Sequence, residues 1–286
     1  MKKGAKILTA INSRRNISSL AKTRQSDKSD NNNNFQGLLK YLEKYKNNQN
    51  PILLSIILPV FNEEKTIKKI LKNLPKYESI EIIIVDDHST DNSLEEIKQV
   101  KDSSNMHIIE HKVNRGYGAA LTTGIQYSKG EVFITIDSDG QHRPKDFFNL
   151  IKPIFDGEAD ITIGSRYKGS YNYELPLATR LGEAILEVGI RIFFAQKVKN
   201  NQGGFRAFHR RTYKMFEETQ FHGYAFTTEL ILSAVLHDYK IKECPIHLLG
   251  REHGASYIVL NKLLISLMLC IGLYAIKNIK RLISRR

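Results

Sequence analysis

Near the middle of the chain lies the stretch Ile134-Thr135-Ile136-Asp137-Ser138-Asp139-Gly140-Gln141-His142, in which an apolar, strand-like run passes into a polar turn. Alternate side chains of an extended segment point the same way, so Asp137, Asp139 and Gln141 can converge. Two carboxylates and an amide oxygen suit a hard cation such as Mg²⁺ or Mn²⁺. A lone Asp-x-Asp pair is also common in an ordinary polar turn, so its meaning depends on the rest of the chain.

Apolar strands alternate with amphipathic helices around this stretch. We expect strands at 53–60, 80–85, 107–110, 131–136 and 160–165, separated by helices at 63–74, 93–100, 119–127 and 145–155. Asn62 is the expected N-cap of the first of these helices. After residue 165 we expect helices at 176–195 and 226–237, a strand or tight turn at 203–208, and a strand at 240–246. This order predicts an α/β fold with a doubly wound, mostly parallel sheet.

Polar groups follow several of the expected strands. Ligands of a doubly wound sheet bind where its parallel strands end. Four such strand exits carry candidate groups: Pro59-Phe61-Glu63, Asp86-Asp87, Arg115 and Asp137-Asp139. We therefore predict a binding site at this edge of the sheet.

The chain is basic mainly at its two ends. Of its net charge of +13, residues 1–50 contribute +8 and residues 251–286 contribute +6, whereas residues 51–250 are nearly neutral at −1. A nucleic-acid enzyme more often spreads positive charge across its working face. Basic ends on a neutral domain fit an anionic membrane surface at least as well, and charge alone leaves both interpretations open.

Composition also suggests how the 286 residues are divided. Residues 1–50 form a polar, basic extension that we expect to be disordered apart from a short helix at 35–46. Residues 51–257 form the main domain, and residues 258–286 form an apolar and then basic tail. The basic N-terminus lacks the apolar run of a signal peptide, so we expect a cytosolic protein in which Cys244 and Cys270 are reduced.

The tail contains fourteen residues without a charge, 263–276, followed by a cluster of Lys and Arg. A membrane span normally needs about 20 apolar residues. A shorter apolar helix with basic flanks is typical of a helix that lies in the membrane interface. An interfacial helix, a short span and a packing helix of a soluble domain all remain open.

Several motifs together resemble glycosyltransferase family 2. The first four are Leu58-Pro59-Val60-Phe61-Asn62-Glu63-Glu64, Val85-Asp86-Asp87-His88-Ser89-Thr90-Asp91, Asn114-Arg115-Gly116-Tyr117-Gly118 and Asp137-Ser138-Asp139-Gly140-Gln141-His142-Arg143-Pro144. Three more resemble its polyprenyl-phosphate branch, of the dolichol-phosphate mannosyltransferase type: Gly164-Ser165-Arg166-Tyr167, Gln202-Gly203-Gly204-Phe205-Arg206 and Arg251-Glu252-His253-Gly254-Ala255-Ser256. The resemblance covers residues 53–257, and its specificity comes from the order of the motifs.

This resemblance implies a sheet of the glycosyltransferase A type with membrane-associated C-terminal helices. It also implies inverting, metal-dependent transfer of a hexose, mannose or glucose, from a GDP- or UDP-sugar to polyprenyl (dolichyl) phosphate. The reaction would use Mg²⁺ or Mn²⁺ at the cytoplasmic face of a membrane, with no nucleic-acid partner. Two alternatives remain: transfer to a soluble or protein-bound hydroxyl with Glu229 as base, and a non-catalytic basic module.

The resemblance also assigns residues to the site. Nucleotide-sugar binding falls to Pro59, Phe61, Glu63, Val85, Asp87, Asp137, Ser138 and Asp139, with Asp87 accepting the imide N–H of the base. The metal falls to Asp137, Asp139 and Gln141. Asp139, Arg166 and Arg251 are the catalytic candidates, and Arg166, Arg206, Arg251 and Ser256 are candidates for the acceptor phosphate. Tyr257, Asn200 and His88 depart from residues that are common at these positions in the family.

Overall fold

A computed structural model describes residues 35–46, 51–100, 104–173, 177–223, 225–251 and 260–284. The chain divides into two units at residue 46, and the structure describes the first of them through residues 35–45. The first unit contributes a helix at 35–43, as predicted. The disorder predicted for the first 34 residues and the phosphate contact predicted for Ser256 lie outside the described residues, as does Tyr257.

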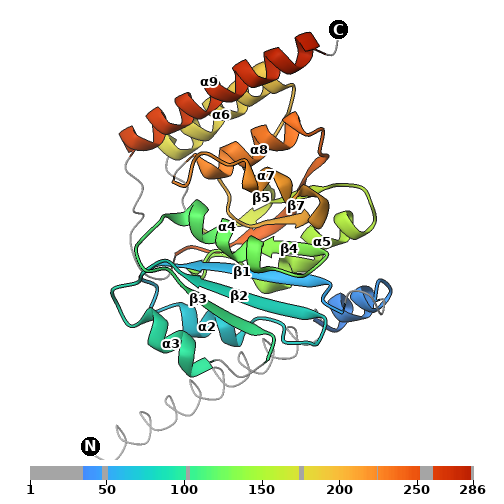
Figure 1. Cartoon of the computed structure of the whole chain (residues 1–286), viewed down its shortest axis with the longest axis vertical. Coiled ribbons are helices and arrows are strands. Elements are labelled where there is room, and N and C mark those ends of the chain that lie inside the picture. The colour runs from blue at the N-terminus through green and yellow to red at the C-terminus, as the bar shows by residue number, and fades with distance from the viewer. Residues whose placement is uncertain are drawn as a thin grey trace, which may run out of the picture. The chain divides into compact units, whose positions relative to one another are not determined.

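The second unit is built on one seven-stranded sheet with the order β3-β2-β1-β4-β6-β5-β7 (Figure 1). Its strands are β1 Leu54–Val60, β2 Ile80–Asp86, β3 Met106–Glu110, β4 Val132–Thr135, β5 Ile161–Tyr171, β6 Arg206–His209 and β7 Ile241–Leu248. Strands β1 to β4 pair in parallel, and so do β5 and β7. β6 runs antiparallel to both β4 and β5, between which it lies. The predicted mostly parallel α/β sheet is confirmed.

The helices connect these strands. They are α2 Ile67–Lys72, α3 Ser93–Val100, α4 Tyr117–Tyr127, α5 Phe147–Phe155 with the short 3₁₀ turn Pro144–Asp146 before it, α6 Leu177–Phe194, the 3₁₀ turn Arg210–Thr212, α7 Lys214–Glu217, α8 Phe226–Leu236 and α9 Leu260–Ser284. α4 lies on one side of β1 and β2, and α2 and α3 lie on the other (Figure 1). The predicted double winding of the sheet is therefore observed.

Helix α2 starts later than the sequence suggested. Asn62 was the predicted N-cap, but it has a left-handed backbone with φ of 55°, and α2 begins after Thr66. The Asn62 Oδ1 accepts hydrogen bonds from the backbone N–H and the hydroxyl of Thr90. Asn62 therefore joins the turns that follow β1 and β2 instead of capping a helix, and residues 63–66 stay free of helix at the sheet edge.

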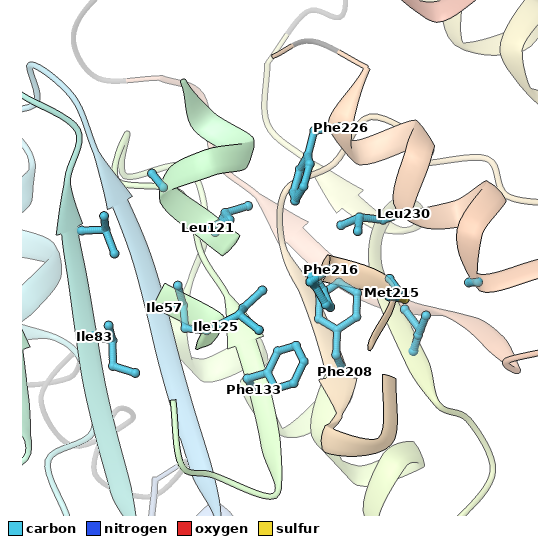
Figure 2. Packing of buried hydrophobic residues seen from close by; sticks show 14 residues of the cluster. Ile57, Ile83, Leu121, Ile125, Phe133, Phe208, Met215, Phe216, Phe226 and Leu230 are labelled. Atoms are coloured by element: carbon cyan, nitrogen blue, oxygen red, sulfur yellow. The ribbon is translucent and has the colours of Figure 1, made fainter. Parts of the chain in front are cut away.

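An apolar core fills the space between the sheet, α4, α7 and α8 (Figure 2). Figure 2 shows Ile57 and Ile83 from the parallel strands beside Ile125 of α4, with Phe133 and Phe208 further along the sheet. The rings of Phe133 and Phe208 stack with centroids 5.4 Å apart. This stacking joins the parallel part of the sheet to the antiparallel strand β6.

The C-terminal helix α9 packs against α6 and α8, whose buried side chains form a second apolar cluster with it. Polar contacts also hold it: Asn278 donates to the carbonyl of Phe193 at the end of α6, and Arg281 donates to the carbonyls of Val235 and Leu236 at the end of α8. These contacts satisfy carbonyls that a helix end leaves unpaired. Among the helices that the structure describes, none is both long enough and apolar enough to cross a bilayer.

Candidate active site

Asp137 and Asp139 lie just beyond β4, at the edge where the parallel strands end. Asp137 accepts a hydrogen bond from the Tyr117 hydroxyl at Oδ1, 2.8 Å away, and its Oδ2 lies 3.2 Å from Nε2 of His142. Asp139 accepts a hydrogen bond from Nη2 of Arg251 at Oδ2, at 2.8 Å. The turn 137–142 is thus fixed by side chains from α4 and from the segment after β7.

The environment of Asp137 keeps it ionised. Burial raises the pKa of the Asp137 carboxyl, but His142, the hydrogen bond from Tyr117 and the charge of Arg251 together outweigh this, and the net pKa is lowered. Burial and the neighbouring Asp137 charge raise the pKa of the Tyr117 phenol well above its usual value, so Tyr117 stays a hydrogen-bond donor. A donor and a negative acceptor face each other here, which favours a stable contact.

The carboxylates at this edge are of the kind that binds a divalent cation, and each of their four oxygens has a partner within the protein. The two aspartates supply hard carboxylate oxygens. Gly204 packs closely against one of them, because a Cβ there would lie 2.5 Å from Oδ1 of Asp137. The side chain of Gln141 donates from Nε2 to the carbonyl of Leu249, and its backbone N–H donates to Oδ1 of Asp139, so its role as a third metal ligand stays a prediction. Within the described part of the chain, no three His, Cys, Asp or Glu side chains form a metal-binding group.

Hydrogen bonds connect the C-terminal end of β1 and the residues after it to the turn 137–142. The Ser138 hydroxyl donates to the carbonyl of Pro59 at 2.8 Å, and the Thr66 hydroxyl lies 2.7 Å from the carbonyl of Ser138. Thr66 also contacts the carboxylate of Glu63 at 3.0 Å. Ser138 therefore ties the turn 137–142 to β1, and Thr66 connects that turn to Glu63. Phe61 is half-buried in the turn after β1.

The carboxylate of Asp87 is already hydrogen-bonded within the protein, so it is not free to accept the imide N–H of a nucleotide base. Its Oδ1 accepts the N–H of Arg115 at 2.9 Å and lies 2.6 Å from Nδ1 of His111, while its Oδ2 accepts the N–H of Gly116 at 2.7 Å. Gly116 has φ of +91°, and a Cβ on it would approach the carbonyl of His222 to 3.0 Å. Asp87 therefore holds the glycine-rich loop before α4, and the prediction that it reads the base is not supported by its contacts.

The neighbouring Asp86 is the better candidate for base recognition. Its Oδ2 accepts the N–H of Ser89, whereas its Oδ1 is buried without a hydrogen-bond partner among the described residues. A buried carboxylate oxygen without a donor is costly, so a ligand N–H there would be favourable. Val85, predicted to lie beside the base, has its side chain in the core cluster and can offer only its backbone.

Arg166 lies in β5 and is engaged by α6. Its guanidinium donates to Glu183 at Oε1 and to the Tyr173 hydroxyl, and Glu183 also contacts the Tyr167 hydroxyl. Burial lowers the pKa of Arg166, but the charge of Glu183 outweighs it and the net pKa is raised. The guanidinium of Arg166 is therefore fixed by its ion pair with Glu183. Its Nε is buried without a partner among the described residues.

Arg206 was a candidate for the acceptor phosphate, and its surroundings contradict that role. Its side chain is buried, and it donates to the carbonyls of Gly203, Thr227 and Asn201 at 2.8, 2.7 and 2.9 Å. Burial lowers the pKa of Arg206 to about 10. Its donors are committed to the backbone, so Arg206 supports the Gly203-Gly204 turn beside Asp137.

Glu229 was the base in the alternative with a hydroxyl acceptor. It is fully buried, and its carboxylate accepts the N–H groups of Gln220 and Phe221 and the hydroxyl of Tyr274. A general base must reach the proton that it removes. These three donors engage the carboxylate within the protein, so the contacts do not favour Glu229 as a base, and that alternative stays a prediction.

Sequence reasoning missed several residues of the site. Tyr117 lies in the motif 114–118 and Thr66 in the helix expected at 63–74, but nothing in their spacing indicated contacts with Asp137 or Ser138. The sequence analysis gave His142 no role, and His111 lies between the motifs 85–91 and 114–118. A hydroxyl or imidazole adjacent to a glycine or aspartate motif is the signal that would have found them.

Comparison with known proteins agrees with the fold and the motifs. The model of the family described as Glycosyl transferase family 2 matches residues 55–216. The UDP-N-acetylglucosamine–dolichyl-phosphate N-acetylglucosaminyltransferase of Methanococcus voltae is 30% identical over 222 residues, which cover 71% of this chain and 88% of that enzyme. The dolichol-phosphate mannosyltransferase of Pyrococcus furiosus is 27% identical over 209 residues, covering 71% of this chain and 58% of that enzyme.

A solved structure shares the fold. Glucosyl-3-phosphoglycerate synthase from Mycobacterium tuberculosis, crystallised with Mn²⁺, UDP-glucose and phosphoglyceric acid, has a TM-score of 0.60 and 20% identity, and the match covers 77% of this chain and 80% of that one. At this identity the likeness concerns the fold alone. The matched family model, the relative at 30% identity and the motif order agree, and the chain is therefore a glycosyltransferase that belongs to glycosyltransferase family 2.

Proposed function

We propose that this glycosyltransferase moves a hexose from a UDP- or GDP-sugar to polyprenyl (dolichyl) phosphate at a membrane surface. The observation that carries the proposal is the 30% identity to an enzyme named for a dolichyl-phosphate acceptor, over 88% of that enzyme's length. The positions of Asp137, Asp139 and Arg251 at one sheet edge support it, because a nucleoside diphosphate needs cationic and metal-binding groups.

Asp137 and Asp139 are the residues that would hold Mg²⁺ or Mn²⁺. A divalent cation bound there would offset the negative charge of the departing nucleoside diphosphate. Tyr117 and His142 orient Asp137, and Ser138 keeps the turn against β1. Arg251 reaches the same turn, so its guanidinium is positioned to contact phosphate oxygens once a ligand competes with Asp139.

The acceptor chemistry requires no general base. A phosphate monoester is already an anion at neutral pH, so one of its oxygens can attack C1 of the sugar directly. The new C1–O bond forms as the bond from C1 to the diphosphate oxygen breaks, and the electron pair leaves with the nucleoside diphosphate, which inverts the configuration at C1. The engagement of Glu229 in three hydrogen bonds supports an acceptor of this kind over a hydroxyl.

Helices α6 and α9 support a membrane-bound acceptor. α9 exposes Ile265, Met268, Leu269, Ile276, Ile279 and Ile283, and α6 exposes Ile185, Val188 and Ile192. Spacings of three, four and seven residues place much of each set along one side of its helix. Lys280 and Arg191 are exposed on the same helices. Apolar stripes with cations on amphipathic helices are typical of binding to an anionic lipid interface.

The test is a transfer assay with labelled donors. The purified full chain is incubated with Mn²⁺, vesicles that contain polyprenyl phosphate, and either labelled UDP-sugars (glucose and N-acetylglucosamine) or labelled GDP-mannose. We expect label in the organic-extractable lipid for one nucleotide class, and a thermal-shift screen with the same donors should select the same class. Transfer only to 3-phosphoglycerate or to a soluble hydroxyl acceptor would contradict the proposal.

A further inference from the structure

Glu229 lies in the first turn of α8 and joins three parts of the chain. Its Oε1 accepts the N–H of Gln220 at 2.8 Å and the hydroxyl of Tyr274 at 2.9 Å, and its Oε2 accepts the N–H of Phe221 at 2.9 Å. All three partners donate hydrogen bonds, so the group that lies between them must be an acceptor that carries no proton. A carboxylate meets this need, and charge-assisted hydrogen bonds offset the cost of burying it.

The loop that Glu229 holds also reaches α4. The carbonyl of His222, one residue beyond Phe221, accepts the N–H of Gly118 at 2.8 Å. The packing around this contact is tight, because a Cβ on Gly118 would lie 2.6 Å from ring atoms of Phe226 and 3.0 Å from Cα of His222. The first turn of α4 therefore packs closely against loop 220–222 and against the first turn of α8.

The start of α4 in turn sets the position of the site. Tyr117, next to Gly118, donates to Asp137 at 2.8 Å, and Gly116 donates to Asp87 at 2.7 Å. The ring of Tyr117 packs edge-on against Phe226, with centroids 6.4 Å apart. A shift of loop 220–222 would therefore move the donor that orients Asp137.

We propose that Glu229 is a positioning residue that fixes Tyr117 against Asp137 through loop 220–222, and that Tyr274 makes this arrangement depend on the docking of α9. The inference rests on the proposed function where it connects the lipid-facing helix α9 to the donor site. Among the polar contacts of α9 described above, that of Tyr274 reaches Glu229, whereas Asn278 and Arg281 contact the ends of α6 and α8. The attachment of α9 and the link to the site can therefore be separated by mutation.

Hydrogen exchange of the full chain without ligand tests the connection directly. In Glu229→Gln, one backbone N–H of loop 220–221 or the Tyr274 hydroxyl must face an amide NH₂ group. We expect the amides of Gly118, Gln220 and Phe221 to exchange at least about tenfold faster, because local contacts open independently of the global fold, while β1 and β2 exchange as in the wild type. Tyr274→Phe, which removes only a hydroxyl, should accelerate the same amides by a smaller factor.

Asn278→Ala is the matched control, because it removes a buried polar contact of the same helix that does not lead to loop 220–222. We expect faster exchange only in the part of α9 that follows Tyr274, which stays docked through Glu229, and an unchanged Gly118 amide. Glu229→Gln and Asn278→Ala should also differ in their effects on activity. Glu229→Gln should lower kcat/KM by about ten- to a hundredfold through misplacement of catalytic groups and should raise the Mn²⁺ concentration for half-maximal rate. Asn278→Ala should leave that Mn²⁺ concentration unchanged.

Two results would overturn the inference. One is unchanged exchange at Gly118 in both Glu229→Gln and Tyr274→Phe, and the other is equal acceleration throughout the sheet, which would make Glu229 a general stability residue. If Glu229→Gln does not fold, Tyr274→Phe decides alone by the same criterion. The exchange measurements need no acceptor, so a wild-type protein that fails to label polyprenyl phosphate would contradict the proposed function without affecting this test.

Discussion

Arg251 donates a hydrogen bond from Nη2 to Oδ2 of Asp139 at 2.8 Å, and this contact joins the end of β7 to the turn after β4. Burial lowers the pKa of Arg251, but the hydrogen bond to Asp139 and the charges of Asp139, Glu63 and Asp137 together outweigh it, and the net pKa is raised. The contact places a permanent cation beside a predicted metal ligand. When a phosphate-bearing donor enters, the guanidinium can exchange one anionic partner for another without losing its charge compensation.

Asp139→Asn tests the aspartate turn. An amide oxygen is a poorer ligand than a carboxylate and cannot offset the charge of Arg251, so we expect transfer to fall by about 10²- to 10³-fold, the range seen when one electrostatic stabiliser is removed. Steady-state rates with and without added Mn²⁺ are the measurement. Glu158→Gln, at an exposed acid paired with Lys242, is the control and should keep the wild-type rate. Full activity of Asp139→Asn would contradict the site.

Asp86 and Asp87 should respond differently to the same substitution. Asp87→Asn replaces an acceptor of two backbone N–H groups, so we expect it to lower the free energy of unfolding by about 1–3 kcal/mol. Asp86→Asn should change stability less. It should weaken binding of the free nucleotide, because an amide NH₂ group would replace the unpartnered acceptor oxygen. Chemical denaturation and calorimetric titration with UDP and GDP separate the two effects. The opposite pattern would restore Asp87 as the residue that reads the base.

Glu63→Gln should stabilise the ligand-free protein at neutral pH. Burial raises the pKa of the Glu63 carboxyl and Asp139 raises it further, against the hydrogen bond from Thr66. A carboxyl with a raised folded-state pKa destabilises the fold when ionised, and the effect disappears below its unfolded pKa. We therefore expect a higher Tm for Glu63→Gln at pH 7 and no difference below about pH 4.3. Thermal unfolding across this pH range is the measurement, and an equal gain at every pH would rule out ionisation as its cause.

Met268→Asp tests the exposed side of α9. Met268 is 74% exposed, so the substitution should leave the fold intact while placing a negative charge on the proposed lipid-facing side. We expect binding to vesicles with anionic lipid to weaken by about tenfold or more, because both apolar insertion and attraction to the surface are reduced. Co-sedimentation with vesicles measures it. Tyr77→Asp, which adds the same charge before β2, should bind like the wild type, and equal losses in both variants would argue against a specific lipid-facing helix.

Much of the sheet follows from sequence because its signals are local. Apolar runs such as 80–85 have strand length, and the rule that ligands bind where parallel strands end placed Asp137 and Asp139 at one edge. The direction of β6 was beyond this reasoning, since a short apolar strand has the same pattern in either orientation. Whether β6 runs parallel or antiparallel to its neighbours depends on how the chain between residues 166 and 205 returns to the sheet. The sequence of that segment does not indicate the direction.

The roles of charged residues were harder to predict than their positions. Arg206 follows two glycines and looks like a phosphate ligand, but its partners are backbone carbonyls up to 21 residues away in sequence. Glu229 contacts Tyr274, 45 residues further along the chain. Spacing within a motif contains no information about such distant donors and acceptors, so a buried structural charge and a catalytic charge look alike until the fold is known.

The position of β6 affects how the protein is made. β6 fills the gap between β4 and β5, and its residues 206–209 follow β4 by about seventy positions. During synthesis, β4 therefore remains an unpaired edge from the time it leaves the ribosome until β6 emerges, which at 5–20 residues per second is roughly 4–14 seconds. Unpaired strand edges promote association between chains. Nascent chains of this enzyme therefore have a defined interval in which chaperones can prevent aggregation.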